Sequence, residues 1–223
     1  MKAVIISNGN FEGVDIHTFS NRANMTICAD GGAKHIINSG VVPDVIVGDM
    51  DSIDKNILKA YEDMHIEICM HPVKKDKTDT ELAVDYAISH GATDITLLGA
   101  TGTRLDHTLA NIMLLYKLLK RNIIAKIIDS HNEISIIDKS GQIEKGIYQY
   151  VSIIPLTTNE NKVTLKGFEY ETYEEHFKLG SSYGVSNRLV NDNGEVYIED
   201  GLFIVIKSKD WFLKSAEYSR FFL

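Results

Sequence analysis

Short apolar runs alternate with amphipathic stretches through the first part of the sequence. These runs occupy residues 2–7, 26–29, 45–48, 66–70, 95–98 and 123–128. Strand-like runs separated by amphipathic stretches are typical of βαβ units. We therefore predict a mostly parallel α/β sheet in this part of the chain.

Two of the amphipathic stretches have the spacing of helices. The first, residues 81–89, places four side chains on one face: Leu82, Ala83, Tyr86 and Ala87. Thr78 or Asp79 can cap its start, so Asp79 lies at or near a helix N-terminus. The second runs from Asp106 to about Lys120, and we expect its buried stripe to contain Leu109, Ile112, Met113, Tyr116 and Leu119.

The pattern changes after about residue 130, where short apolar runs are separated by turn residues. These runs lie at 134–137, 150–154, 163–165, 195–198 and 202–206. Glycines punctuate them, and Asn193-Gly194 is a good hairpin turn. We predict an antiparallel β-sandwich, so that residues 1–130 form an α/β domain and residues 131–223 a β domain.

Length and charge limit the classes of function. The 223 residues can form one large domain or two of ordinary size. A formal net charge of -8 argues against a nucleic-acid surface and suits a small cationic substrate better. No secretory signal is recognised and no apolar run is long enough to span a bilayer, so we expect a cytoplasmic protein that binds no membrane.

Six aspartates lie at turns that follow strand-like runs or open helix-like ones: Asp30, Asp49, Asp51, Asp76, Asp79 and Asp106. Ligands of parallel α/β sheets bind at the carboxyl ends of the strands, so these turns can converge on one site. Carboxylates gathered there would repel one another unless divalent cations neutralised them. Magnesium with phosphates is therefore the natural hypothesis.

Two pairs of aspartates carry this hypothesis. Asp49 and Asp51 follow an apolar run, and side chains two apart in an extended segment point the same way, so both can face one ion. Asp76 and Asp79 lie in a run that also contains lysines, which the remaining phosphate oxygens require. The alternatives are ordinary turn or cap aspartates for the first pair and a solvated charged loop for the second.

A glycine-rich turn at residues 99–104 lies between a predicted strand and a predicted helix. Backbone N–H groups can cradle an anion in this context, and Arg104 can supply a fixed cation. The turn is not a P-loop, and alone it could be a plain strand-to-helix connection. No histidine spacing indicates zinc, and no serine lies in a hydrolase elbow.

Taken in order, these motifs resemble those of the thiamine pyrophosphokinase family. The motifs are Ala29-Asp30-Gly31-Gly32, Pro43-Asp44, Gly48-Asp49-Met50-Asp51-Ser52, Asp76-Lys77-Thr78-Asp79, Gly102-Thr103-Arg104-Leu105-Asp106-His107 and, in the second half, Gly184-Val185-Ser186-Asn187. The resemblance implies an α/β nucleotide-binding domain joined to a β-sandwich in a homodimer. It also implies that ATP and thiamine are converted to AMP and thiamine diphosphate.

The resemblance assigns roles by motif position. Asp49, Asp51, Asp76 and Asp79 would hold Mg²⁺ and the ATP phosphates as the catalytic residues. The predicted ATP-binding residues are Asp30, Thr101, Gly102, Arg104, Asp106 and His107. Ser186 and Asn187 would reach thiamine in the neighbouring subunit's site, at the subunit interface. Lys75, where the family has a glutamine or another polar residue, receives no role toward thiamine.

Two other functions fit the same carboxylates. In a magnesium-dependent nucleotide phosphohydrolase they would activate water rather than an alcohol. In a non-catalytic nucleotide sensor they would hold a structural ion. Pyrophosphoryl transfer is the interpretation that the ordered motifs favour.

Overall fold

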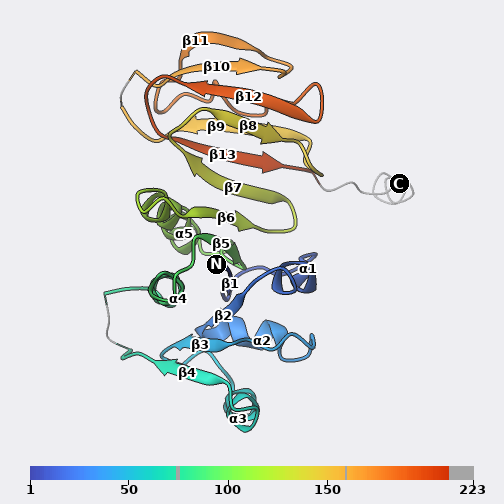
Figure 1. Ribbon diagram of the computed structural model, residues 1–223, viewed down its shortest axis with the longest axis vertical. Helices are drawn as coiled ribbons and strands as arrows, with labels where there is room; N and C mark the ends of the chain where they lie inside the picture. Colours follow the sequence, from blue (N-terminus) through green and yellow to red (C-terminus); the bar gives the residue numbers. More distant parts are fainter. Residues whose placement is uncertain (74–75, 159, 211–223) are drawn as a thin grey trace, which may run out of the picture. The chain divides into compact units, whose positions relative to one another are not determined.

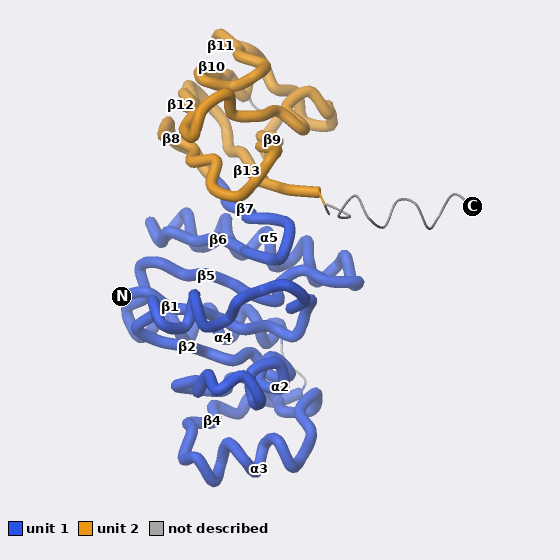
Figure 2. The backbone as a smooth tube through the Cα atoms, turned by 90° about the vertical axis from the view of Figure 1, so that its right-hand side faces the viewer, with its two compact units in different colours: residues 1–136 blue, residues 137–223 orange. Residues whose placement is uncertain are grey.

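A mostly parallel sheet forms the first of two units, residues 1–136 (Figures 1 and 2). The computed structural model describes residues 1–73, 76–158 and 160–210. The strands of this unit are β1 (Lys2–Ile6), β2 (Met25–Ala29), β3 (Val45–Gly48), β4 (Glu67–Met70), β5 (Asp94–Leu98), β6 (Ile124–Ile128) and β7 (Asn132–Ile137). They lie in the order β4-β3-β2-β1-β5-β6-β7, and only the β6–β7 pair among these is antiparallel. The six predicted strands of the first half are thus confirmed.

Helices cover both faces of this sheet. They are α1 (Ile16–Ser20), the short 3₁₀ helix η1 (Asp30–Gly32), α2 (Ala33–Ile36), α3 (Lys55–Asp63), α4 (Asp79–Ser89) and α5 (Leu105–Leu119). Figure 1 shows α1 and α2 on one face and α4 and α5 on the other. No described helix is both long and apolar enough to cross a membrane.

Strand β1 shows why its apolar run is unbroken. Side chains alternate across a strand, so Val4 and Ile6 enter the core beneath α1 and α2, while Ile5 faces the opposite side. All three are almost completely buried. A strand covered on both faces needs apolar residues at every position, which distinguishes it from a half-exposed strand.

Helix α4 begins where the sequence indicates. The side chain of Thr78 caps it by accepting a hydrogen bond from the backbone N–H of Glu81 at 3.2 Å, so Asp79 is the first helical residue. Its buried residues are Thr80, Ala83, Val84 and Ala87, which corrects the prediction at Leu82 and Tyr86. Those two side chains are only partly buried.

Helix α5 buries a different stripe from the predicted one. Its buried residues are Asn111, Ile112, Leu114, Leu115 and Leu118. Leu109, Met113 and Tyr116, expected in the core, are instead exposed, at 58%, 44% and 43%. The prediction failed because apolar residues surround most of this helix, so spacing alone admits two stripes. Packing against β6 decides which one is buried.

Antiparallel strands in two layers form the second unit, residues 137–223. Strand β9 (Tyr150–Pro155) pairs with β13 (Phe203–Ser208). A separate sheet has the order β11 (Thr172–His176), β10 (Lys162–Lys166), β12 (Asn193–Ile198), β8 (Gly141–Glu144). Val151 of β9, Val205 of β13, Val163 of β10 and Val196 of β12 share one core, so the predicted β-sandwich is confirmed.

Two details of the second unit differ from expectation. Strands β8 and β11 were not predicted, since their residues are mostly polar and exposed. Asn193-Gly194 is not a turn but the start of β12, opposite Glu144 and Ile143 of β8. A Cβ atom on Gly194 would lie 2.3 Å from a methyl carbon of Leu189, so this glycine serves close packing rather than a tight turn.

Candidate active site

The candidate site lies where the order of the parallel strands reverses. Strand β1 has β2 on one side and β5 on the other. The loops that follow β1 and β5 leave neighbouring strand ends toward helices on opposite faces of the sheet, and a crevice opens between them. A cavity of about 470 Å³ opens there in the first unit. Its lining comes from the loops after β1, β2, β3 and β5 and from the first residues of α4 and α5.

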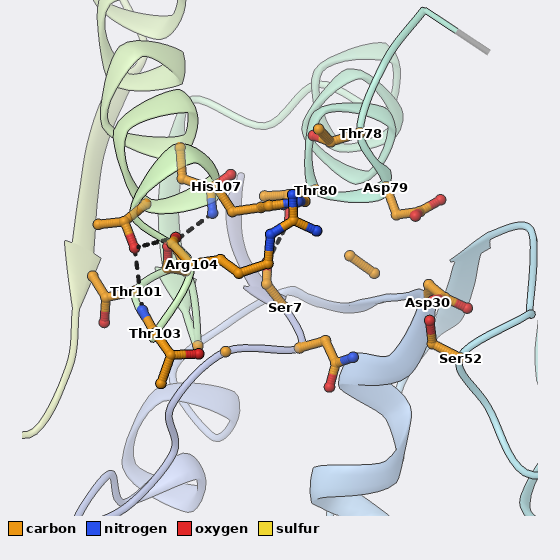
Figure 3. A pocket seen from close by; sticks show the side chains of 18 of the residues that line it. Ser7, Asp30, Ser52, Thr78, Asp79, Thr80, Thr101, Thr103, Arg104 and His107 are labelled. Carbon is orange, nitrogen blue, oxygen red and sulfur yellow. Dashed lines mark hydrogen bonds between the residues drawn. The ribbon is translucent and has the colours of Figure 1, made fainter. Parts of the chain in front are cut away.

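Three carboxylates from separate segments form a cluster, and two of them, Asp30 and Asp79, line this cavity. One oxygen each of Asp30, Asp49 and Asp79 lies within 4.8 Å of the others. Asp30 directly follows β2, Asp49 directly follows β3, and Asp79 is the first residue of α4. In the view of Figure 3, Asp30 and Asp79 lie at one end of the cavity, away from Arg104 and His107.

Gly48 makes this gathering possible. Its φ of 154° is a conformation that side chains rarely adopt. A Cβ atom at this position would lie 2.8 Å from Cβ of Asp30 and 2.9 Å from Oδ1 of Asp79. Asp30 itself has a φ of 42°, which is unusual for a residue other than glycine and turns its side chain off the course of the strand.

The carboxylate oxygens of this cluster are suitable ligands for a small divalent cation. Asp30 is 5% exposed, and among the described residues its buried Oδ1 atom has no hydrogen-bond partner. A buried carboxylate oxygen without a donor is costly, and a cation would satisfy it. Three carboxylate oxygens around one point are the hard ligands that Mg²⁺ prefers.

The glycine-rich turn after β5 is held with its carbonyl groups occupied. The carbonyl oxygens of Gly99 and Thr101 accept hydrogen bonds from backbone N–H groups of Gly9 and Asn10, at 2.7 and 2.8 Å. That of Ala100 accepts from Nδ2 of Asn111 at 2.8 Å. In a planar trans peptide the next N–H points the opposite way, so the N–H groups of Ala100 and Thr101 face away from these partners. Neither N–H has an acceptor in the described part of the chain, so the turn keeps two donors for an anion.

Arg104 brings a cation to the same end of the cavity. Its guanidinium forms a two-pronged pair with Asp106, with Nε donating to Oδ1 at 3.2 Å. The hydrogen bond from Arg104 holds the pKa of Asp106 at about 2, far below its usual range. Both side chains are well exposed, so Arg104 can also reach a ligand. His107, one residue further on, lines the cavity as well.

Several lining residues carried no motif signal. The hydroxyl groups of Ser7 and Thr80 lie 2.9 Å apart, buried between the two ends of the cavity (Figure 3). Lys77, from the predicted Asp76-Lys77-Thr78-Asp79 motif, also lines the cavity and forms an ion pair of 2.8 Å with Asp85. Asn111 lies one helical turn beyond His107, where helical spacing could have indicated it.

The structure brings together some of the predicted site residues. Asp49 and Asp79 join in the carboxylate cluster with Asp30, which was expected to bind ATP. Thr101, Gly102, Arg104 and His107 line the cavity together with Asp30 and Asp79, and Asp106 is paired with Arg104.

Asp51 and Asp76 lie outside the cluster that the described residues form. Met50 has a φ of 63°, so residues 49–51 are not the extended segment on which the pairing of Asp49 with Asp51 relied. Instead, the N–H of Asp51 donates to Oδ1 of Asp49 at 3.3 Å, and its exposed carboxylate accepts from Ser52. Asp76 is exposed in the loop before α4. Both stay predicted ligands.

Ser186 and Asn187 belong to the second unit. Ser186 is exposed and has a φ of 62°. The Asn187 amide is engaged within the protein, since Oδ1 accepts from the N–H of Tyr170 and Nδ2 donates to its carbonyl oxygen. Contact of either residue with thiamine stays a prediction. Lys75 and the C-terminal tail from residue 211 lie outside the described residues.

Comparison with known proteins gives one consistent result. A family model described as the catalytic domain of thiamin pyrophosphokinase matches residues 16–127, and one for its vitamin B1 binding domain matches residues 133–203. A thiamine pyrophosphokinase of Bacillus subtilis is 33% identical over 198 residues, which cover 88% of this chain and 92% of that protein. Thiamine pyrophosphokinase 1 of Arabidopsis thaliana is 26% identical over 214 residues, covering 84% of this chain and 79% of its own.

Solved structures show the same similarity. The crystal structure of the Bacillus subtilis thiamine pyrophosphokinase superposes with a TM-score of 0.87 at 31% identity and covers 95% of this chain and all of its own. That of the Geobacillus thermodenitrificans enzyme gives 0.84 at 30% identity, with 94% and 98% of the two chains covered.

Proposed function

The chain belongs to the thiamin pyrophosphokinase family, and we propose that the cavity of its first unit is where ATP reacts. The enzyme transfers the pyrophosphoryl group of ATP to the hydroxyl group of thiamine, which yields thiamine diphosphate and AMP. The observation that supports this location best is the cluster of Asp30, Asp49 and Asp79, two of which, Asp30 and Asp79, line the same cavity as the glycine-rich turn.

Asp30, Asp49 and Asp79 would hold Mg²⁺. The buried Oδ1 atom of Asp30 and the spacing of the three carboxylates support this assignment. Asp51 and Asp76 are exposed, and they lie two residues after Asp49 and three residues before Asp79. We propose that both complete the contacts to the metal and the phosphates once substrates bind. The cation supplies charge neutralisation for the triphosphate when it is bound.

The turn at residues 99–104 would hold the nucleotide. The N–H groups of Ala100 and Thr101 can donate to phosphate oxygens, and Arg104 and His107 add positive or polar groups beside them. Helices α4 and α5 both begin at the cavity, and helix N-termini favour anions. A carboxylate end and an anion-binding end in one cavity suit a triphosphate stretched between them.

The chemistry asks little covalent work of the protein. A bond forms between the thiamine oxygen and the β-phosphorus, and the bond from that phosphorus to the oxygen bridging the α-phosphorus breaks, so this oxygen leaves with AMP. The hydroxyl proton passes to a carboxylate of the cluster late in the transfer. The chain's own contribution is to align the reacting atoms and to stabilise charge on the phosphates.

Thiamine would be bound with help from the second unit, at Ser186 and Asn187, in a homodimer whose site lies at the subunit interface. An exposed apolar stripe on α5, formed by Leu105, Leu109, Met113 and Tyr116, supports the presence of a second copy. A cytoplasmic location stays a prediction.

The test pairs the complete reaction with matched variants. AMP and thiamine diphosphate are followed together in the presence of ATP, Mg²⁺ and thiamine, and each component is omitted in turn. We expect equal yields that depend on thiamine and disappear on chelation. Asp79→Asn should reduce turnover at least 100-fold, whereas Asp63→Asn, the same change on the exposed end of α3, should not.

Other outcomes would redirect the assignment. Phosphate or AMP released without thiamine diphosphate would indicate a hydrolase, and saturable ATP binding without AMP would indicate a sensor. Full activity in Asp79→Asn would place the reaction outside this cavity.

A further inference from the structure

Asp129 connects the glycine-rich turn to a distant part of the chain. Its Oδ2 atom accepts a hydrogen bond from the hydroxyl group of Thr101 at 2.9 Å, across 28 positions of sequence. Asp129 lies between β6 and β7, in a segment that no catalytic motif marks. Its side chain is partly buried.

The other hydrogen bonds of Asp129 fix its carboxylate. Oδ1 accepts from the backbone N–H groups of His131 and Asn132 at 2.8 and 2.7 Å, and Nδ2 of Asn132 donates to both oxygens. A carboxylate held by this many donors cannot turn freely, so Oδ2 presents a stationary acceptor to Thr101.

The hydrogen bond between Thr101 and Asp129, here called the link, acts on the part of the turn whose backbone N–H groups are available to an anion. Because the Thr101 hydroxyl donates to Asp129, its one proton is not available to a phosphate. What the link fixes is the backbone of Thr101, whose N–H has no acceptor among the described residues. Asn111, Gly9 and Asn10 hold the carbonyl groups of the turn, and Asp129 holds the side chain of Thr101.

We propose that Asp129 is a positioning residue for the nucleotide, which acts through Thr101 to keep the N–H groups of residues 100 and 101 aligned for the ATP phosphates. This inference rests on the proposed role of the turn. Donors aligned before binding cost no ordering when ATP arrives, so a loose turn weakens ATP binding more than it slows the chemical step.

The experiment is a double-mutant cycle on the full-length enzyme, with Thr101→Val, Asp129→Ala and both together. Each single variant should raise KM for ATP about tenfold while kcat and KM for thiamine change less than threefold, in line with the loss of a hydrogen bond to a charged group. If Asp129 acts through Thr101, the double variant should be no worse than either single one. An additive increase of about 100-fold would overturn the proposal.

Two conservative variants separate the link from damage to the fold. Thr101→Ser and Asp129→Asn both keep a hydrogen-bonding group at the link, and KM for ATP should stay within about threefold of the wild-type value. Asp54→Ala removes another carboxylate that accepts a backbone N–H, at the start of α3, and should lower thermal stability without changing KM for ATP. If KM for ATP increased equally in Asp54→Ala and Asp129→Ala, the role of Asp129 would be merely structural.

Hydrogen exchange gives a second readout that needs no turnover. The amides of Gly9, Asn10 and Gly102 donate hydrogen bonds to or within the turn, and they should exchange faster in Thr101→Val and in Asp129→Ala than in the wild type, before any nucleotide is added. Unchanged exchange would overturn the proposal even if Asp129→Ala folds poorly, because Thr101→Val leaves the bonds of Asp129 to residues 131 and 132 intact. A wild-type enzyme that makes no thiamine diphosphate would refute the proposed function instead.

Discussion

Gly48 approaches Asp30 so closely that a Cβ atom on Gly48 would lie 2.8 Å from the Cβ atom of Asp30. The same added atom would lie 2.9 Å from Oδ1 of Asp79. Two aspartates of the proposed metal cluster, Asp30 through its Cβ atom and Asp79 through its carboxylate, therefore lie against a position that has room only for hydrogen. The absence of a side chain at residue 48 sets the spacing of the cluster.

Gly48→Ala should accordingly disable the enzyme. The added methyl group pushes Asp30 and Asp79 apart, and a misplacement of about 1 Å at reacting groups can cost about 100-fold in rate. The φ of 154° adds backbone strain of about 1–3 kcal/mol. Steady-state kinetics and thermal unfolding would measure both effects. Gly141→Ala is the control, because no atom lies within 4 Å of a Cβ placed there; equal losses in both variants would refute this account.

Asp30→Asn should stabilise the metal-free protein while abolishing its response to Mg²⁺. Removing one of three clustered charges relieves repulsion, which is on the order of 1–3 kcal/mol for partly shielded carboxylates at this separation. Calorimetry with and without Mg²⁺ would show a raised melting temperature for the metal-free variant and no further rise with the cation. Asp63→Asn should respond to Mg²⁺ as the wild type does. A Mg²⁺ response retained by Asp30→Asn would exclude Asp30 as a ligand.

Lys117 joins α5 to α4, and its loss should weaken the unit at neutral pH. Its Nζ atom lies 2.9 Å from Glu81 and 2.6 Å from Asp85, all only about a quarter exposed. Lys117→Met should lower the free energy of unfolding by about 1 kcal/mol, whereas Lys59→Met, on an exposed position of α3, should change it little.

The same network predicts a dependence on pH. Burial alone would raise the pKa of Asp85, but hydrogen bonds from Lys117 and Lys77 outweigh it and hold this pKa below its usual value of 3.8. Because the pKa is lower in the folded than in the unfolded state, the stabilisation is present above about pH 4 and is lost as pH falls through the folded value. Urea titrations from pH 7 to pH 2.5 should therefore show the difference between Lys117→Met and the wild type shrinking below pH 4. A constant difference would contradict this assignment.

Arg104→Met should raise KM for ATP about tenfold, as expected for losing a charged partner of a phosphate, and leave KM for thiamine unchanged. It should also raise the pKa of Asp106 from about 2 toward its usual range, since the largest cause of the low value is the hydrogen bond from Arg104. Carboxylate titration by NMR measures the second effect independently of activity. Arg121→Met, just beyond α5, is the control for loss of an exposed arginine.

Leu109→Glu should separate the proposed dimer. Leu109 is 58% exposed in the single chain, so a glutamate there costs little within the chain but would bury a charge in an interface across the α5 stripe. Sedimentation velocity should show dimers for the wild type and for Met64→Glu, an exposed apolar position at the C-terminal cap of α3, and monomers for Leu109→Glu. Dimeric Leu109→Glu would place the interface elsewhere.

The sequence predicted the strands of the first unit and the start of α4 because those features depend on local chemistry. Apolar runs indicate strands that are covered on both faces. A threonine just before an amphipathic stretch, as Thr78 is before α4, indicates the start of a helix. The buried face of α5 was not predictable in this way. Leu109 and Leu115 are equally apolar, and only the position of β6 decides which is buried.

The carboxylate cluster shows the same division between local and non-local information. Asp49 and Asp79 were expected at strand and helix ends, and they do meet. The motifs place Asp30 beside these aspartates as an ATP-binding residue, and nothing local shows that its left-handed backbone brings its carboxylate into the cluster itself. Asp51 was paired with Asp49 on the assumption of extended backbone, which the positive φ of Met50 breaks.

The central place of β1 has a consequence for the order in which the protein can be made. β1 is synthesised before the other strands described, yet one of its two neighbours is β5, which ends at residue 98. The β1–β5 pair therefore cannot form until the chain through residue 98 has been synthesised, and the two sides of the cavity can come together only after that. Catalytic competence arrives late in translation, well after the aspartates that supply its charge.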